Sequence, residues 1–214
     1  MAVELPVGDE GALEEARELI LAESRAIAQV AHRLGEPFLE SVRAVTRCEG
    51  RVLLTGSGTS GTAARRLEHL LCSCGIAAFF MDPAYALHGP SAIVSPGDVL
   101  LVLSKGGASA DVNEFVAVAR GRGARIISWT WNPESPLAAA SDVVVVLRSG
   151  EGAEGEGVLP FGSSLVMAAV GDALCLLARR ERGIDLEELV VTHPAGATAD
   201  LVRNRPKPEG AGDR

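Results

Sequence analysis

The chain has 214 residues, of which 47% are hydrophobic and only 4% aromatic, and this length suits one domain with a substantial core. Its formal net charge of −8 argues against a general affinity for nucleic acid, because phosphate backbones select basic surfaces. No apolar run reaches the length expected of a membrane span, and residues 1–20 lack the basic start and apolar centre of a signal peptide. We therefore expect a cytoplasmic protein with neither a nucleic-acid nor a membrane partner.

The elements expected from hydrophobic periodicity begin with two helices, over residues 9–34 and 37–47. Short apolar runs then alternate with helical segments. The expected strands are 52–54, 77–80, 99–103, 125–128 and 143–147, and the expected helices are 62–74, 112–120, 136–140 and 163–182. Strands that are apolar along their whole length, separated by helices, indicate a parallel sheet covered on both faces. The sequence therefore predicts an α/β three-layer sandwich with a five-stranded parallel sheet, doubly wound and flavodoxin-like.

This pattern divides the chain into three parts. Residues 1–47 are predicted to be helices that pack on the domain, residues 48–200 form the domain, and residues 201–214 are expected to be disordered. Of the four cysteines, Cys72 and Cys74 are close in sequence, but no second pair completes a zinc site. We expect reduced cysteines and neither a metal nor a cofactor. Trp129 and Trp131 are expected to pack at the edge of the sheet, with a place in the wall of a pocket as the alternative.

Two glycine- and hydroxyl-rich loops follow the first and third expected strands. The first is Thr55-Gly56-Ser57-Gly58-Thr59-Ser60-Gly61 and the second is Ser104-Lys105-Gly106-Gly107-Ala108-Ser109. Each leads directly into a helix, whose N-terminus favours an anion, and ligands of open parallel sheets bind beyond the carboxyl ends of the strands. Neither loop is a Walker A motif, and the first fits a dinucleotide fingerprint poorly. We infer a seat for one phosphate group, with tight turns that only cap the helices as the alternative.

These loops, with several other short motifs, resemble the sugar isomerase (SIS) domain family, and in particular its arabinose 5-phosphate isomerase branch. The resemblance extends from about Arg51 to Val202. The further motifs are Asp82-Pro83, His88-Gly89, Ser135-Pro136-Leu137-Ala138, Ala140-Ser141-Asp142, Gly171-Asp172-Ala173-Leu174, Arg182-Gly183 and His193-Pro194-Ala195-Gly196. Their order and spacing together are more specific than any one of them. Many relatives carry nucleotide-sensing modules after this domain, and the present sequence stops before them.

The resemblance also implies a set of site residues. Phosphate contacts are expected from Ser57, Thr59, Ser60, Ser104, Lys105, Gly106, Ser109, Ser163 and Ser164, with backbone help from Gly107. Acid–base residues are expected to be His193, Glu154, Asp111 and His88, and His193 is expected to serve the site from a neighbouring subunit.

Each acid–base candidate has an alternative reading. His193 could cap a surface turn, and His88 could be a surface loop residue. Asp111 could stabilise the dipole of its helix. Glu151 and Glu156 compete with Glu154 because glycines blur the register of their loop, which could also be merely solvated.

The function implied is an aldose–ketose isomerase that moves a proton through an enediol(ate), most directly on a pentose 5-phosphate such as arabinose 5-phosphate. Its partner is a phosphorylated monosaccharide, and the resemblance implies a homotetramer with active sites at subunit interfaces. Thr59 stands where the family commonly has a lysine and Ala108 where it has a glutamate. The alternatives are therefore a non-catalytic phosphosugar-binding regulatory protein, an isomerase of a hexulose or heptose phosphate, or another phosphosugar reaction on the same fold.

Overall fold

The structure, a computed structural model, describes residues 8–149, 152–185, 187–192 and 197–204. Five parallel strands form one sheet in the order β2-β1-β3-β4-β5. The strands are β1 (Val52–Thr55), β2 (Ala78–Phe80), β3 (Val99–Leu103), β4 (Arg125–Thr130) and β5 (Val143–Val146). All residues of β1 and β3 are buried, as expected of central strands covered on both faces. The α/β class, the five parallel strands and the doubly wound arrangement are confirmed.

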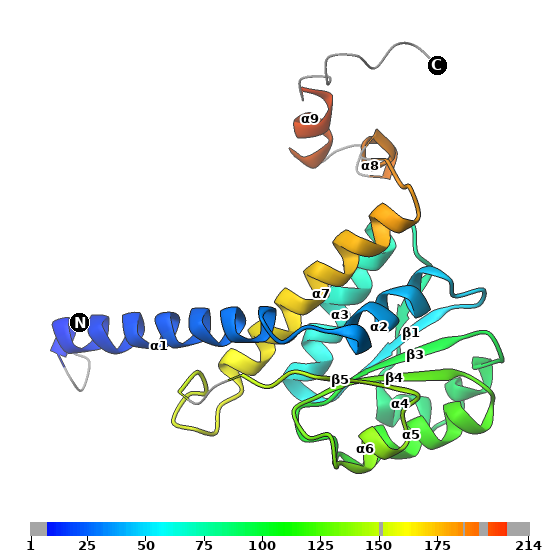
Figure 1. The fold of residues 1–214 in the computed structure, drawn as a ribbon, viewed down its shortest axis with the longest axis horizontal. Helices are drawn as coiled ribbons and strands as arrows, with labels where there is room; N and C mark the ends of the chain where they lie inside the picture. Colours follow the sequence, from blue (N-terminus) through cyan, green and yellow to red (C-terminus); the bar gives the residue numbers. More distant parts are fainter. Residues whose placement is uncertain (1–7, 150–151, 186, 193–196, 205–214) are drawn as a thin grey trace.

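Helices cover both faces of the sheet (Figure 1). One face packs against α1 (Gly8–Ala31), α2 (Glu36–Thr46), α3 (Gly58–Ser73) and α7 (Phe161–Glu181). The other packs against α4 (Pro83–Ala86), α5 (Ala110–Gly121) and α6 (Pro136–Ala139), beside a short 3₁₀ helix, η1 (Pro90–Ile93). Leu54 and Leu53 of β1 belong to the first and the second core respectively, because successive side chains of a strand point to opposite faces.

The chain beyond α7 forms two short helices, α8 (Glu187–Thr192) and α9 (Ala197–Arg203). The helix α9 includes residues 201–203, the start of the tail that we expected to be disordered. Residues 205–214 lie outside the described part of the chain.

Helix α7 corrects one expectation from the sequence. By length and composition it could cross a membrane, whereas we expected no such segment. Half of its apolar stretch is buried inside the domain, where Val166, Val170 and Leu174 join the core beneath α3 and α1. This packing is typical of the central helix of a domain core.

Helix α1 is buried only near its C-terminal end, at Ala26 and Val30, and its first half extends away from the domain (Figure 1). Leu13, Ile20 and Leu21 on this helix are each more than half exposed. These apolar side chains are not covered by the sheet or by the other helices of the described chain, and a second copy of the chain could cover them.

Candidate active site

The two glycine-rich loops lie next to each other at the carboxyl edge of the sheet. Strands β1 and β3 are paired neighbours, yet α3 packs on one face of the sheet and α5 on the other. This is a topological switch point, where the loops separate and leave a crevice in open α/β sheets. The candidate site is therefore built around the first turns of α3 and α5.

The first loop brings α3 very close to the end of β1. A Cβ on Gly61 would lie 2.5 Å from the carbonyl oxygen of Gly56, and a Cβ on Gly56 would lie 2.7 Å from the carbonyl oxygen of Leu103. The hydroxyl of Ser57 does not cap α3; it donates a hydrogen bond of 3.0 Å to Oδ2 of Asp111 in α5. The expected phosphate residue Ser57 and the expected acid–base residue Asp111 are thus in direct contact.

The second loop is fixed by internal hydrogen bonds. The hydroxyl oxygen of buried Ser104 accepts the N–H of Gly107 at 3.2 Å. The side-chain amide of Asn113 donates to the carbonyl oxygens of Gly107, at 3.2 Å, and Ser109, at 3.0 Å. Asn113 was not among our sequence candidates. The signal that could have found it is an asparagine one turn into a helix that follows a glycine-rich loop, since asparagine commonly bonds to nearby backbone.

Gly107 and Gly106 give a matched pair of substitutions in this loop. Gly107 has φ of +64°, and a Cβ there would lie 2.2 Å from Oγ of Ser135, whereas a Cβ on Gly106 meets nothing within 4 Å. We expect Gly107→Ala to lower the free energy of unfolding by about 2–4 kcal/mol, through backbone strain and overpacking. Gly106→Ala should change it by less than about 0.5 kcal/mol. Urea denaturation of both variants checks this, and equal stabilities would contradict the described loop geometry.

The third component is the segment before α7. Oε1 of Glu154 accepts the backbone N–H of Ser163 at 3.0 Å and lies 2.9 Å from Nζ of Lys105. Its Oε2 is buried and has no hydrogen-bond partner within the described chain. A Cβ on Gly162 would lie 2.4 Å from Cβ of Ala153, so this glycine lets the first turn of α7 close onto the segment. Glu154 therefore joins the second loop to the N-terminus of α7.

A hollow of about 610 Å³ adjoins Glu154, between α1 and residues 152–156. Leu19 and Arg25 of α1 are part of its lining. No residue of the two glycine-rich loops lines this hollow.

The remaining candidates are placed as follows. Thr59 and Ser109 are exposed, Ser60 is half-buried, and Ser163 is buried. The hydroxyl of Ser164 is engaged with the carbonyl oxygen of Phe161 at 2.8 Å.

His88 is exposed in the turn after α4, and no hydrogen bond or ion pair joins its side chain to another described candidate. Glu156 is exposed with φ of +50°, whereas His193 and Glu151 lie outside the described residues.

Both tryptophans are packed, but Trp129 lies in β4, between β3 and β5, and not at the edge of the sheet as expected from the sequence. Trp129 is fully buried and its indole N–H donates to Ser41, while Trp131 donates to Ser149 at 3.1 Å. Among the described residues, no group of three or more His, Cys, Asp or Glu side chains could hold a metal ion.

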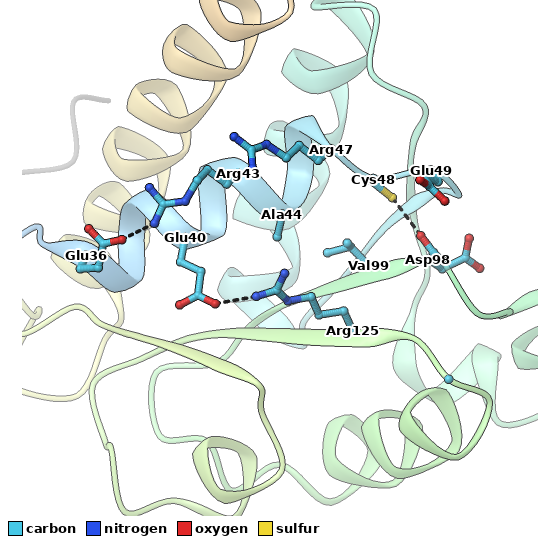
Figure 2. A pocket seen from close by; sticks show the side chains of 12 residues that line it. Glu36, Glu40, Arg43, Ala44, Arg47, Cys48, Glu49, Asp98, Val99 and Arg125 are labelled. Atoms are coloured by element: carbon cyan, nitrogen blue, oxygen red, sulfur yellow. Dashed lines mark hydrogen bonds and ion pairs between the residues drawn. The ribbon is translucent and has the colours of Figure 1, made fainter.

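A second hollow, of about 540 Å³, lies at the opposite, amino edge of the sheet beneath α2 (Figure 2). Its arginines are occupied by carboxylates: Arg43 is paired with Glu36, and Arg125 lies 2.5 Å from Glu40. These two ion pairs neutralise the charges of both arginines.

A family model described as the SIS domain matches residues 46–177, which include both glycine-rich loops and most of α7. The chain belongs to the SIS domain family. Arabinose 5-phosphate isomerase KdsD of Pseudomonas aeruginosa is 32% identical to this SIS domain chain over 185 residues, covering 86% of the chain and 57% of the relative. Arabinose 5-phosphate isomerase GutQ of Escherichia coli K12 is 29% identical over 196 residues, covering 92% and 61%. The chain thus spans about three-fifths of the length of these relatives.

A solved SIS-type structure extends over the same part of the chain. It is c3406 of E. coli CFT073 in complex with arabinose 5-phosphate, with a TM-score of 0.83 and 26% identity. The match covers 87% of the present chain and 100% of the solved one. The fold described here therefore corresponds to the whole of that protein chain.

Proposed function

We propose that this SIS domain chain is a phosphosugar aldose–ketose isomerase that acts on a pentose 5-phosphate such as arabinose 5-phosphate. The observation that carries the proposal is the carboxylate of Glu154, held between Lys105 and the N-terminus of α7 beside the glycine- and hydroxyl-rich loops. The two curated relatives named as arabinose 5-phosphate isomerases, and the c3406 complex with that sugar phosphate, support the same substrate class.

The phosphate group is assigned to the switch point between β1 and β3. The first turns of α3 and α5 present free backbone N–H groups there, and the helix dipoles favour a dianion. The hydroxyls available for hydrogen bonds to its oxygens are those of Thr59, Ser60 and Ser109, because the Ser57 hydroxyl donates to Asp111. Because Lys105 is paired with Glu154, we assign it to holding that carboxylate, in place of the phosphate contact expected from the sequence.

The proton transfer is assigned to Glu154. In the aldose, its carboxylate takes the proton from C2, the electron pair left behind forms the C1=C2 double bond of the enediolate, and the charge moves to the carbonyl oxygen. After a proton has moved from O2 to O1, the electron pair on O2 forms the C=O bond of the ketone, and the electrons of the C1=C2 bond take the proton back from Glu154 at C1. A second group must move a proton between O1 and O2, and we assign this step to His193 of a neighbouring subunit. Asp111, bonded to Ser57, orients the first loop.

The phosphate assignment is tested by Ser60→Ala, at a half-buried position in the first turn of α3. A hydrogen bond to a charged group contributes about 1.5–3 kcal/mol, so its loss should raise the KM for arabinose 5-phosphate by roughly 10- to 100-fold with little change in stability. Thr62→Ala is the matched control, because the Thr62 hydroxyl bonds within α3 to the Gly58 carbonyl oxygen. An unchanged KM in the Ser60 variant would contradict the proposed phosphate seat.

A second candidate function is a phosphosugar-binding protein without catalysis. It is favoured by Thr59, which stands where the family commonly has lysine. An isomerisation assay by NMR over phosphorylated pentoses and hexoses, together with ligand-dependent thermal shifts, separates the two. Thermal stabilisation by a phosphosugar without any turnover would favour the binding protein, and turnover of a hexose phosphate alone would change the proposed substrate.

We also propose a cytoplasmic homotetramer with shared sites. The support is three exposed apolar side chains of α1, Leu13, Ile20 and Leu21, of which Leu21 also lines the hollow beside Glu154. Two inactive variants, His193→Ala and Glu154→Gln, should recover activity when their subunits are mixed and reassembled. Some shared sites then combine the intact Glu154 of one subunit with the intact His193 of its neighbour. Sedimentation analysis gives the number of subunits, and a monomer would contradict the proposal.

A further inference from the structure

Two cysteines that are far apart in the sequence meet where α3 packs against α7. Cys74 directly follows the last residue of α3 and is half-buried, and Cys175 lies within α7 and is buried. The Cys74 thiol donates a hydrogen bond of 4.0 Å to the backbone carbonyl oxygen of Cys175, and each thiol lies close enough to shift the pKa of the other. Both are free thiols, and the two helices run side by side in Figure 1.

The surroundings give the two thiols different reactivities. The hydrogen bond from the Cys175 thiol favours the thiolate of Cys74; burial opposes this and the charge of Arg179 assists it, so that the pKa of Cys74 is lowered to about 7. The same hydrogen bond, together with burial, raises the pKa of Cys175. The thiolate is the reactive form of cysteine. Cys74 is therefore the nucleophile, and Cys175 is the thiol that can resolve a mixed disulfide.

The other two cysteines differ from this pair. Burial raises the pKa of the Cys48 thiol, and its Sγ contacts the carbonyl oxygen of Gly97. Cys72 is exposed and its Sγ is 3.2 Å from the carbonyl oxygen of Ala78. Among the described thiols, Cys74 and Cys175 alone shift each other's pKa.

We propose that Cys74 and Cys175 form a reversible disulfide bond when the protein meets a small-molecule disulfide such as oxidised glutathione. The Cys74 thiolate attacks one sulfur of glutathione disulfide, whose S–S bond breaks and releases one glutathione thiolate. Cys175 then loses its proton and attacks the Cys74 sulfur, which releases the second glutathione. Two protein thiols are oxidised and one glutathione disulfide is reduced to two glutathione molecules.

The bond would join parts of the chain 101 residues apart, which reduces the entropy of the unfolded chain. It would also tie together α3 and α7, whose first turns line the candidate active site. The modification is thus independent of the proposed reaction but joins two helices that carry its residues.

In the experiment, the reduced full chain is incubated with oxidised glutathione and the remaining thiols are blocked with an alkylating reagent. The protein is then digested with trypsin, and the disulfide bonds are mapped by mass spectrometry. Cys72 and Cys74 fall on one tryptic peptide, so Cys72→Ser is the background that makes the assignment unique. We expect a cross-link between Cys74 and Cys175 in this background. It should raise the Tm by about 5–10 °C and be reversed by dithiothreitol.

The controls are Cys74→Ser and Cys175→Ser in the same background, and both should lose the cross-link and the rise in Tm. Alkylation of Cys74 and Cys175 as free thiols after the oxidant would overturn the proposal. So would a glutathione adduct that stays on Cys74, or a disulfide that uses Cys48 in place of either residue. Isomerase activity is not the readout, so failure of this proposal and failure of the proposed function can be told apart.

Discussion

Glu154→Gln should lower kcat for arabinose 5-phosphate by about 100- to 10,000-fold, the usual contribution of a positioned general base. The amide oxygen of glutamine can still accept the N–H of Ser163, which Glu154 accepts at 3.0 Å, but the side chain can no longer take a proton. It also loses the ion pair with Lys105. Steady-state kinetics give kcat and KM separately, and circular dichroism shows whether the fold is kept.

The matched control is Glu156→Gln, on the same segment but with an exposed side chain and no described partner. It removes the same charge and should retain at least half of the activity. A large loss of kcat in Glu156→Gln with none in Glu154→Gln would contradict the proposal and would identify Glu156 as the general base.

The second large effect is on stability, at the amino edge of the sheet. The carboxylate of Asp98 is fully buried and accepts hydrogen bonds from the backbone N–H groups of Arg51, at 2.8 Å, and Ser95, at 2.9 Å. The Arg51 guanidinium pairs with its Oδ2 at 2.9 Å. Asp98→Ala leaves the two backbone donors unpaired and removes the carboxylate that neutralises Arg51, and should lower the free energy of unfolding by about 3–5 kcal/mol.

Urea denaturation measures this loss. Asp172→Ala is the control, because it also breaks an aspartate–arginine pair, with Arg66, but at an exposed surface position. Exposed pairs contribute about 0–1 kcal/mol, so the control should remain close to the unsubstituted protein. Equal losses in the two variants would show that burial of the Asp98 pair contributes nothing extra.

The contribution of Asp98 should also depend on pH. Burial acts to raise the pKa of Asp98, but the hydrogen bonds from Arg51 and Ser95 and the guanidinium charge outweigh it, so the pKa lies below its ordinary value of 3.8. A carboxyl whose pKa is lowered by folding stabilises the folded state above its unfolded pKa and loses this effect as pH falls through the folded pKa. The stability difference between the unsubstituted protein and Asp98→Ala should therefore be constant above about pH 5 and decrease below about pH 4.

Several boundaries of the fold could not be read from the sequence. Residues 58–61 combine glycine with hydroxyl residues and read as a loop, so the third helix was expected from residue 62. In the structure α3 begins at Gly58, because Gly61 has no Cβ and its turn can close against Gly56. The short helices α4, α8 and α9 were also missed, since four to seven residues show little helical period, whereas the equally short α6 was expected from residues 136–140.

The candidate site was predictable as a set of loops but not as a set of contacts. The positions of the loops followed from where the apolar strands end, and both loops do lie at the predicted edge. The contact of Ser57 with Asp111, the support from Asn113 and the ion pair of Lys105 with Glu154 join residues on different elements. Local sequence carries no signal for them, because they depend on how α3, α5 and α7 are placed around one sheet.

The amino-acid sequence by itself determined the fold class, the order of the strands along the chain and the positions of the two glycine- and hydroxyl-rich loops. These depend on local hydrophobic pattern and on glycine, whose effects reach only a few residues along the chain. Only the tertiary structure decided which side chains meet: that Lys105 reaches Glu154, that Asp98 is buried beneath Arg51, and that Cys74 lies against Cys175. Such pairs form because the packing of two hydrophobic faces brings distant segments together, and side chains there must satisfy one another in the absence of water.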